Sequence, residues 1–235
     1  MHEGRSVSVV FPAYNEEDGI SEAVSTFLAV EAVDEVVVVD NNSRDRTAEL
    51  AEAAGARVVS ETRQGYGFAL QRGLAEARTD LVVMSEPDGT FSAKDIHKLL
   101  AYADDAELVL GTRTTRELIW DAANMGWFLR WGNWLVAKLL EVLYDTPSLS
   151  DVGCTMRLVH RDALERFRPK LTVGSSHFLP EMVVLARLSD VSMIEVPVNY
   201  RARTGDSKIT GTLKGTLTTG SAMIALILRY RFAAR

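Results

Sequence analysis

The chain has 235 residues, 47% of them hydrophobic, which suffices for one large α/β domain with a buried core but not for two full domains. Its formal net charge of −6 gives no electrostatic support to a nucleic-acid-binding role. A single cysteine excludes an internal disulfide framework and suits a reducing compartment, so the cytoplasm is the expected location.

The first half of the chain alternates short β-branched runs with helical patterns. Strands are predicted at Ser6–Phe11, Val33–Asp40, Arg57–Ser60, Leu81–Ser85 and Glu107–Gly111, and helices at Glu17–Leu28, Asp45–Ala54, Gly67–Ala77 and Asp95–Ala103. Continuous valine runs such as Val36–Val39 indicate strands that are buried on both faces, as in a mostly parallel sheet. The alternation therefore predicts a doubly wound α/β fold, which binds ligands at the carboxyl ends of its strands.

The second half is more helical. The expected elements are a helix at Asn124–Tyr144, an irregular segment at Asp145–Gly153, a helix at Pro180–Leu188, a strand at Met193–Val198, a basic loop at Arg201–Lys208 and a last helix at Leu213–Tyr230. Residues 1–210 are interpreted as one domain and 211–235 as a C-terminal amphipathic helix. That helix is expected either to lie in a membrane interface or to pack on the domain or on a second subunit. Four tryptophans, Trp120, Trp127, Trp131 and Trp134, are expected to pack against helices, and contact of some of them with lipid or an interface is the alternative.

Polar segments follow the first two predicted strands. Pro12–Glu16 comes after the first strand, where Tyr14 offers a flat face to a base and Glu16 a polar edge, although a strand exit into a helix N-terminus would look the same. Asp40 ends the second strand, and its carboxylate could accept bonds from a ribose or a base. Helix capping explains Ser43 and Asp45 but leaves Asp40 unexplained.

Glu86-Pro87-Asp88 is the strongest local signal. Two carboxylates follow a buried strand directly, and hard oxygen ligands at such a place suit Mg²⁺ or Mn²⁺, which keep coordination positions open for substrate phosphates. An acidic turn is the alternative interpretation of this segment. No Gly-x-Gly-x-x-Gly and no Walker A loop follows the first strand, which disfavours a dinucleotide or P-loop site.

Several cations lie outside the regular solvated helix faces. In a net-acidic chain, basic residues in loops after strands indicate an anionic ligand, and the 203–208 segment suits closure over a diphosphate. The alternative is a solvated surface loop. These cations are Arg113, Arg130, Arg157, Arg201, Arg203 and Lys208.

Taken together, these motifs resemble the family 2 glycosyltransferases, in particular the polyprenyl-phosphate branch typified by dolichyl-phosphate mannose synthase. The resemblance covers about residues 6–210. It rests on Pro12–Glu16, on Asp40–Thr47, on Glu86–Asp88 in place of an Asp-x-Asp motif, on Gly111–Arg113 and on Arg203–Lys208. Glu86 stands where the family has aspartate, so Asp88 is the firmer metal ligand. The resemblance implies a GT-A type fold with a Rossmann-like nucleotide-binding core, and inversion at the anomeric carbon.

The resemblance also implies roles for individual residues. Pro12, Tyr14, Glu16 and Asp40 would hold the nucleotide of a sugar donor linked to UDP or GDP. Mg²⁺ or Mn²⁺ at Asp88, with Glu86, would meet the donor diphosphate together with Arg203 and Lys208. Arg113 and Arg130 would hold the phosphate of a polyprenyl phosphate acceptor. If the acceptor were instead a neutral hydroxyl, a base would be required, and Glu181 and Asp151 are the candidates.

Three questions remain open at this level. The acceptor could be a lipid phosphate, a soluble molecule or a polysaccharide, and a catalytically silent nucleotide-sugar-binding module is the alternative from another class. Peripheral contact with the inner face of a membrane is one expectation for the terminal helix, and a homo-oligomer is another. The donor's base and sugar are not specified by the motifs.

Overall fold

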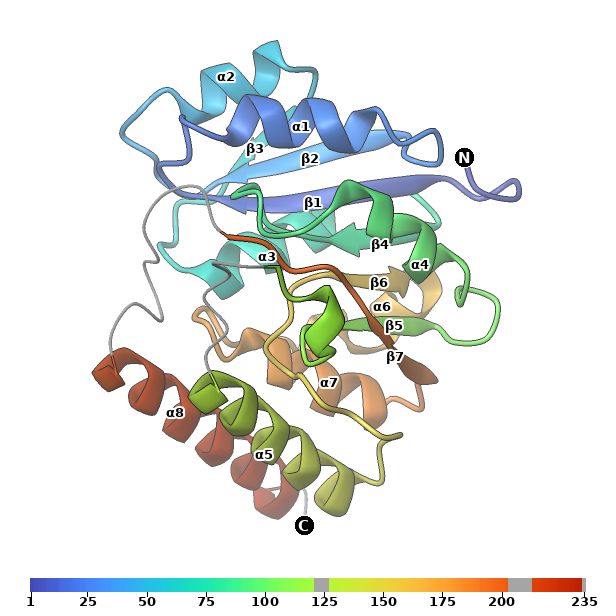
Figure 1. The fold of residues 1–235 in the computed structure, drawn as a ribbon, viewed down its shortest axis with the longest axis vertical. Coiled ribbons are helices and arrows are strands. Elements are labelled where there is room, and N and C mark those ends of the chain that lie inside the picture. The colour runs from blue at the N-terminus through green and yellow to red at the C-terminus, as the bar shows by residue number, and fades with distance from the viewer. Residues whose placement is uncertain (121–126, 203–212, 234–235) are drawn as a thin grey trace.

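A computed structural model describes residues 1–120, 127–202 and 213–233, without the side chains of 127–129, 213–217 and 233. Seven strands form one sheet in the order β3-β2-β1-β4-β6-β5-β7, with helices on both faces (Figure 1). The strands are β1 (Val7–Ala13), β2 (Glu35–Asp40), β3 (Arg57–Ser60), β4 (Leu81–Met84), β5 (Leu108–Thr112), β6 (Arg157–His160) and β7 (Met193–Pro197). Six of these strands had been predicted within a few residues, which confirms the α/β class.

The pairing is mostly parallel, as predicted. Strand β1 pairs in parallel with both β2 and β4, β2 pairs with β3, and β5 pairs with β7. Strand β6 was missed, and it is antiparallel to both of its neighbours, β4 and β5. The reason is its length, because Arg157-Leu158-Val159-His160 contains only two apolar residues and gives no periodic signal.

The helices divide between the two faces of the sheet. Helices α1 (Ile20–Leu28), α2 (Thr47–Ala53) and α4 (Ile96–Leu100) contribute to one apolar cluster, and α3 (Tyr66–Glu76), α5 (Trp127–Tyr144), α6 (Arg161–Phe167), α7 (Phe178–Arg187) and α8 (Leu213–Ala233) to the other. Short 3₁₀ turns lie at Ala93–Asp95, Arg116–Leu118 and Arg168–Lys170. Alternate side chains of the central strands enter opposite clusters, as the valine runs predicted.

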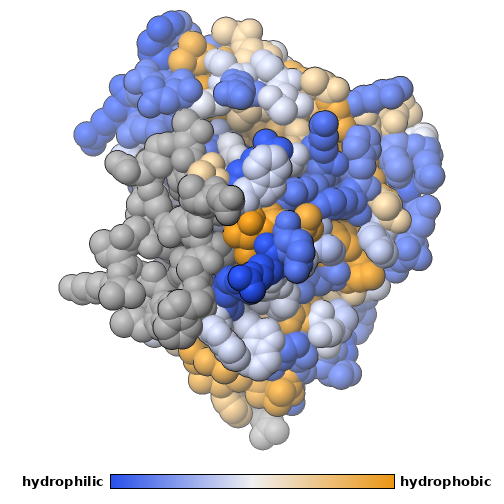
Figure 2. Space-filling view, in the orientation of Figure 1, coloured by the Kyte–Doolittle hydropathy of each residue, from blue (hydrophilic) through white to orange (hydrophobic). Residues whose placement is uncertain are grey.

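The C-terminal helix α8 packs beside α5 and against α7 (Figure 1). The Tyr144 hydroxyl of α5 donates to the Ile227 carbonyl of α8 at 2.7 Å. Apolar surface gathers where these two helices lie (Figure 2). Exposed apolar residues of α5 include Leu135 and Val142, and Trp131 of the same helix is 61% exposed. Its ring packs on that of Trp134 in the same helix, with centroids 5.4 Å apart, and contact with lipid or an interface stays a prediction. Among the described helices, none combines the length and the apolar character that crossing a bilayer requires.

Candidate active site

A pocket of about 190 Å³ opens where β1, β2 and β4 end. Because β1 pairs in parallel with both other strands, their carboxyl ends meet at one edge of the sheet. The pocket is lined by Pro12, Ala13, Tyr14, Glu16, Asn41, Gln64, Tyr66, Ala69, Glu86, Pro87 and Asp88. Five residues predicted from the sequence, Pro12, Tyr14, Glu16, Glu86 and Asp88, thus line one cavity.

At the end of β2, Asn41 rather than Asp40 lines the pocket. The Asn41 amide donates to the carbonyls of Glu61 and Arg63 at 2.8 Å, and its Oδ1 accepts from the Gly65 amide at 2.7 Å. Asn41 therefore fixes the loop that leads into α3. Asp40 accepts a hydrogen bond from the Ser43 amide at 3.2 Å, so its carboxylate holds a turn. A ribose-binding role for Asp40 remains a prediction.

Two glycines at the start of α3, Gly65 and Gly67, serve packing. A Cβ at Gly67 would lie 2.2 Å from the Val173 carbonyl oxygen, and one at Gly65 would lie 2.2 Å from the Gly174 carbonyl oxygen. The Gly67 amide also donates to the Gly174 carbonyl at 2.9 Å. These glycines let the start of α3 approach the 173–174 backbone closely, which positions Tyr66 at the pocket.

Two hydroxyl groups converge on Glu86. Its Oε1 lies 3.2 Å from the Tyr66 hydroxyl and 2.5 Å from the Thr155 hydroxyl, and those two hydroxyls are 2.5 Å apart. Asp88 is 2% exposed, and its Oδ1 accepts bonds from the amide and the hydroxyl of Thr90, at 3.0 and 2.6 Å. Both carboxylates are therefore held in fixed orientations.

The pair has the electrostatics of a cation site. Burial and then the neighbouring Asp88 charge raise the pKa of Glu86 to about 7, against smaller opposing effects from Thr155 and Arg113. A divalent cation beside the two carboxylates would favour the ionised form of Glu86. Within the described residues no three His, Cys, Asp or Glu side chains cluster to hold a metal alone. Two carboxylates fit Mg²⁺ or Mn²⁺, whose other positions substrate phosphates and waters fill.

Arg113 follows β5, and its charge is already balanced. The Arg113 Nε lies 2.7 Å from Asp151 Oδ2, and its Nη2 lies 3.0 Å from Oδ1, while the Arg113 side chain is 13% exposed. Burial lowers the pKa of Arg113, but the Asp151 charge outweighs this effect and raises the pKa well above its ordinary value. Two of the three guanidinium nitrogens are thus engaged, and binding of an acceptor phosphate by Arg113 stays a prediction.

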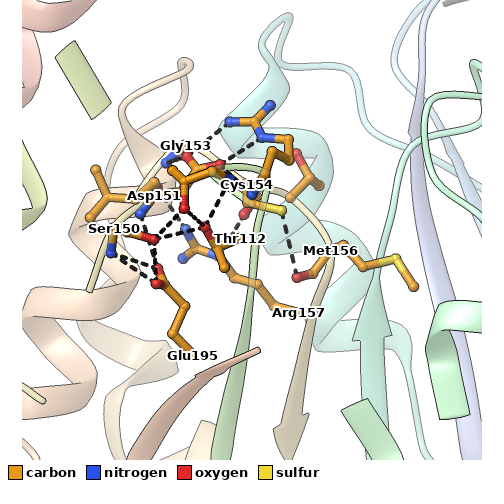
Figure 3. A network of polar contacts seen from close by, with 12 residues as sticks. Thr112, Ser150, Asp151, Gly153, Cys154, Met156, Arg157 and Glu195 are labelled. Atoms are coloured by element: carbon orange, nitrogen blue, oxygen red, sulfur yellow. Dashed lines mark hydrogen bonds and ion pairs between the residues drawn. The ribbon is translucent and has the colours of Figure 1, made fainter. Parts of the chain in front are cut away.

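The segment that carries Asp151 is anchored to β7 and β6 (Figure 3). Glu195 accepts bonds from the Ser150 amide and hydroxyl, at 2.9 and 2.6 Å, and from the Asp151 amide at 3.0 Å. Arg157 is fully buried and donates only to carbonyls, those of Cys154, Leu179 and Val152. Arg157 therefore holds the backbone, and the expectation that it meets an anionic ligand is wrong.

Glu181 and Asp151, the candidate bases, both have structural partners. Glu181 is fully buried on α7, and its oxygens accept bonds from the Thr172 amide and hydroxyl, the Val173 amide and the Tyr230 hydroxyl. Asp151 is occupied by Arg113 and by the Gly153 amide. Neither lines the pocket, so the geometry gives a base role no support.

Of the other site cations predicted from the family resemblance, only Arg130 is among the described residues. Arg130 lies in the first turns of α5, is half-buried and does not line the pocket. Arg203 and Lys208 lie outside the described residues.

Sequence reasoning missed Tyr66 and Thr155 as site residues. Tyr66 stands between Gly65 and Gly67, and glycines permit close backbone approach to a ligand but also make ordinary turns. Thr155 is 69 residues from Glu86 in the chain, and no local pattern links the two.

Comparison with known proteins identifies the family of the chain. The family model for glycosyl transferase family 2 matches residues 8–168. The chain is 35% identical over 221 residues to an uncharacterized glycosyltransferase of Mycobacterium bovis, covering 91% of this chain and 94% of that protein. It is 29% identical over 227 residues to a dolichyl-phosphate hexose transferase of Haloferax volcanii, covering 96% and 95% of the two chains.

Among solved structures, the fold resembles glucosyl-3-phosphoglycerate synthase from Mycobacterium tuberculosis in complex with Mn²⁺, UDP and glucosyl-3-phosphoglycerate. The TM-score is 0.70 at 25% sequence identity, and the match covers 97% of this chain and 80% of that one. Another structure of the same enzyme contains Mg²⁺ and UDP, with a TM-score of 0.69 and the same identity.

Proposed function

The chain belongs to glycosyl transferase family 2 and is a glycosyltransferase, and from this premise we propose that it moves a sugar from a nucleoside diphosphate sugar to a polyprenyl phosphate. The observation that carries the proposal is the Glu86–Asp88 carboxylate pair in the wall of a pocket at the carboxyl edge of the sheet. The relevant reaction breaks the bond between the anomeric carbon and the donor phosphate oxygen. The acceptor oxygen forms a new bond to that carbon as the nucleoside diphosphate leaves with the electron pair of the broken bond.

The donor side follows from the pocket lining. Tyr14 and Pro12 offer flat apolar surface for a base, and Glu16 and Asn41 offer polar edges beside it. The carboxylates of Glu86 and Asp88, which also line the pocket, would hold Mg²⁺ or Mn²⁺, with Asp88 as the firmer ligand. When bound, the ion would neutralise charge that grows on the departing diphosphate. Structures of the related synthase with UDP and either ion support this assignment.

The polyprenyl phosphate acceptor rests on two kinds of support. The dolichyl-phosphate hexose transferase matches this chain over nearly the whole length of both proteins. A phosphate monoester is also largely ionised at neutral pH and needs little help from a base, and both candidate bases are occupied by structural contacts. Direct displacement by the acceptor oxygen would invert the anomeric centre.

A soluble acceptor is the second candidate, because the similar solved structure holds glucosyl-3-phosphoglycerate. The lipid acceptor and the soluble acceptor both carry a phosphate group, so the apolar chain is the difference between them. A polysaccharide hydroxyl acceptor is less well supported, since it would require a base. A silent nucleotide-sugar-binding module predicts nucleotide binding without turnover.

The test is a transfer assay with labelled UDP- and GDP-linked sugars, Mg²⁺ or Mn²⁺, and either a polyprenyl phosphate or 3-phosphoglycerate. A lipid-linked sugar phosphate that forms only with added ion is the expected product. Transfer to 3-phosphoglycerate alone would replace the lipid acceptor with the soluble one. Tight binding of a nucleotide sugar without any product would favour the silent module.

A further inference from the structure

Three chain segments form a small ladder directly after the carboxylate pair. Tyr200 bridges Phe91 in antiparallel pairing and Ile119 in parallel pairing. The Arg201 amide donates to the Thr90 carbonyl at 2.9 Å, and the Trp120 amide donates to the Tyr200 carbonyl at 2.9 Å. Arg201 therefore lies in one row between Thr90 and Trp120.

The ladder has two faces because side chains alternate along extended segments. The rings of Phe91 and Tyr200 contact each other on one face, with centroids 5.6 Å apart. On the other face the Arg201 guanidinium lies 4.3 Å from the centroid of the Trp120 ring. Thr90 shares the row of Arg201, and its hydroxyl donates to Asp88 at 2.6 Å. Arg201 is thus bonded through its backbone to Thr90, the residue whose hydroxyl contacts the predicted metal ligand Asp88.

Hydrogen bonds fix the position of the Trp120 ring. The Trp120 Nε1 donates to Asn199 Oδ1 at 3.3 Å, and the Asn199 side-chain amide donates to both oxygens of Asp95, at 2.9 and 3.1 Å. Trp120 itself is 51% exposed, so its ring forms part of the surface beside the site.

Arg201 has no anionic partner in the described part of the chain. None of the ion pairs there includes it, and its Nε is buried without a hydrogen-bond partner. By contrast, Arg113 is paired with Asp151, and Arg157 is satisfied by three carbonyls. A guanidinium stacked on an aromatic ring keeps its in-plane N–H groups available, and these match the oxygens of a phosphate in pairs.

We propose that Arg201, held on Trp120, binds the phosphate monoester of the acceptor. This inference rests on the proposed transferase function and adds a residue to the acceptor side. The carboxylates of Glu86 and Asp88 repel an anionic acceptor, so a cation beside them is needed to bring it close. The exposed face of Trp120 next to that cation would contact whatever carries the phosphate, a prenyl chain or a glycerate.

The test measures binding and transfer separately. Binding of farnesyl phosphate, 3-phosphoglycerate and uncharged farnesol to the Mn²⁺- and nucleotide-loaded protein is measured by calorimetry, for wild type, R201A and R201K. We expect R201A to weaken binding of the phosphate-bearing probe at least about tenfold, since a charged hydrogen-bond partner is lost. The affinity for the nucleotide should stay the same. R201K, which keeps the charge without the planar fork, should lie between the two. Farnesol should bind wild type and R201A equally.

The control is R116A, which removes an exposed arginine from the same 112–120 segment. Equal losses in R116A and R201A, unchanged binding in R201A, or no binding of either phosphate by wild type would each overturn the inference. Which probe binds tells a lipid phosphate from a soluble one. If wild type binds a probe through Arg201 but transfers no sugar, the proposed function fails and the inference stands. If wild type transfers sugar and R201A has the same KM for the acceptor as wild type, the inference fails and the proposed function stands.

Discussion

Arg113 and Asp151 form a bidentate ion pair beside the site, with the Arg113 Nε 2.7 Å from Asp151 Oδ2 and Asp151 fully enclosed. The pair connects the end of β5 to the 149–153 segment, which Glu195 of β7 holds in place. Removing one partner would leave a buried charge uncompensated, so this pair matters for stability as well as for the shape of the site.

We therefore expect D151N to lower the free energy of unfolding by about 3–5 kcal/mol, as for other broken buried pairs. Urea titration followed by circular dichroism measures this. The control is E165Q, which breaks the partly exposed pair of Glu165 with Arg168, and it should cost less than about 1 kcal/mol. Similar losses in both variants would show that burial of the Asp151 pair adds nothing.

The same pair gives a pH dependence. Burial raises the pKa of Asp151, but the charge and hydrogen bonds of Arg113 outweigh it and place the pKa below its ordinary value of 3.8. The stabilisation by the ionised carboxylate is therefore complete above that value and is lost as the pH falls through the lower folded-state pKa. Unfolding curves of wild type should lose stability in this acid range more steeply than those of D151N. Parallel curves would contradict the assignment.

Asp88 carries the proposed metal site, so D88N should reduce turnover by roughly 100-fold or more because charge on the leaving diphosphate is no longer neutralised. The affinity for Mn²⁺, measured by titration in the presence of nucleotide, should fall with it. D18N, at an exposed position before α1, is the matched control and should keep both values. A D88N protein that folds and turns over normally would refute the proposed role.

Tyr66 and Thr155 are expected to act through Glu86. Y66F and T155V each remove a hydroxyl that converges on Glu86 Oε1, and loss of such an orienting contact weakens metal binding by about 10-fold or more. Mn²⁺ affinity from electron paramagnetic resonance gives the readout, and turnover at saturating Mn²⁺ should recover in part. The exposed Tyr102 supplies the control, Y102F. If Mn²⁺ affinity is unchanged in both variants, Glu86 is no metal ligand or needs no orientation.

Substitution of Glu181 distinguishes a catalytic role of this residue from a structural one. Because Thr172, Val173 and Tyr230 all donate to its carboxylate, E181Q should lower the free energy of unfolding by about 1–3 kcal/mol while leaving kcat unchanged well below the melting temperature. Y230F, which removes one of these donors, should show a smaller loss of stability. A large fall of kcat in a folded E181Q protein would instead support the base role that a neutral hydroxyl acceptor would require.

Cys154 is fully buried, and burial raises the pKa of its thiol to about 12. Since the thiolate is the reactive form, the thiol at about pH 8 should react with Ellman's reagent roughly a thousandfold more slowly in the native protein than in concentrated guanidinium chloride. Reaction at the same rate in both states would show that Cys154 is accessible.

Much of the donor side was determined by the sequence alone. Valine-rich runs specify strands buried on both faces, and parallel strands bring their carboxyl ends to one edge. Pro12, Tyr14 and Glu16 after β1, and Glu86 and Asp88 after β4, therefore had to lie near one another, and they line one pocket.

The tertiary structure alone decided the rest. The insertion of β6 between β4 and β5 brings Thr155 to Glu86 across 69 residues, and Asp151 meets Arg113 across 38. A residue's type does not reveal whether a partner from a distant segment already occupies it. Arg113 and Arg201 look equivalent in the sequence, but among the described residues a buried carboxylate faces Arg113 and none pairs with Arg201. Periodicity and motif spacing report contacts between near neighbours, whereas pairing of remote polar groups depends on how the whole chain packs.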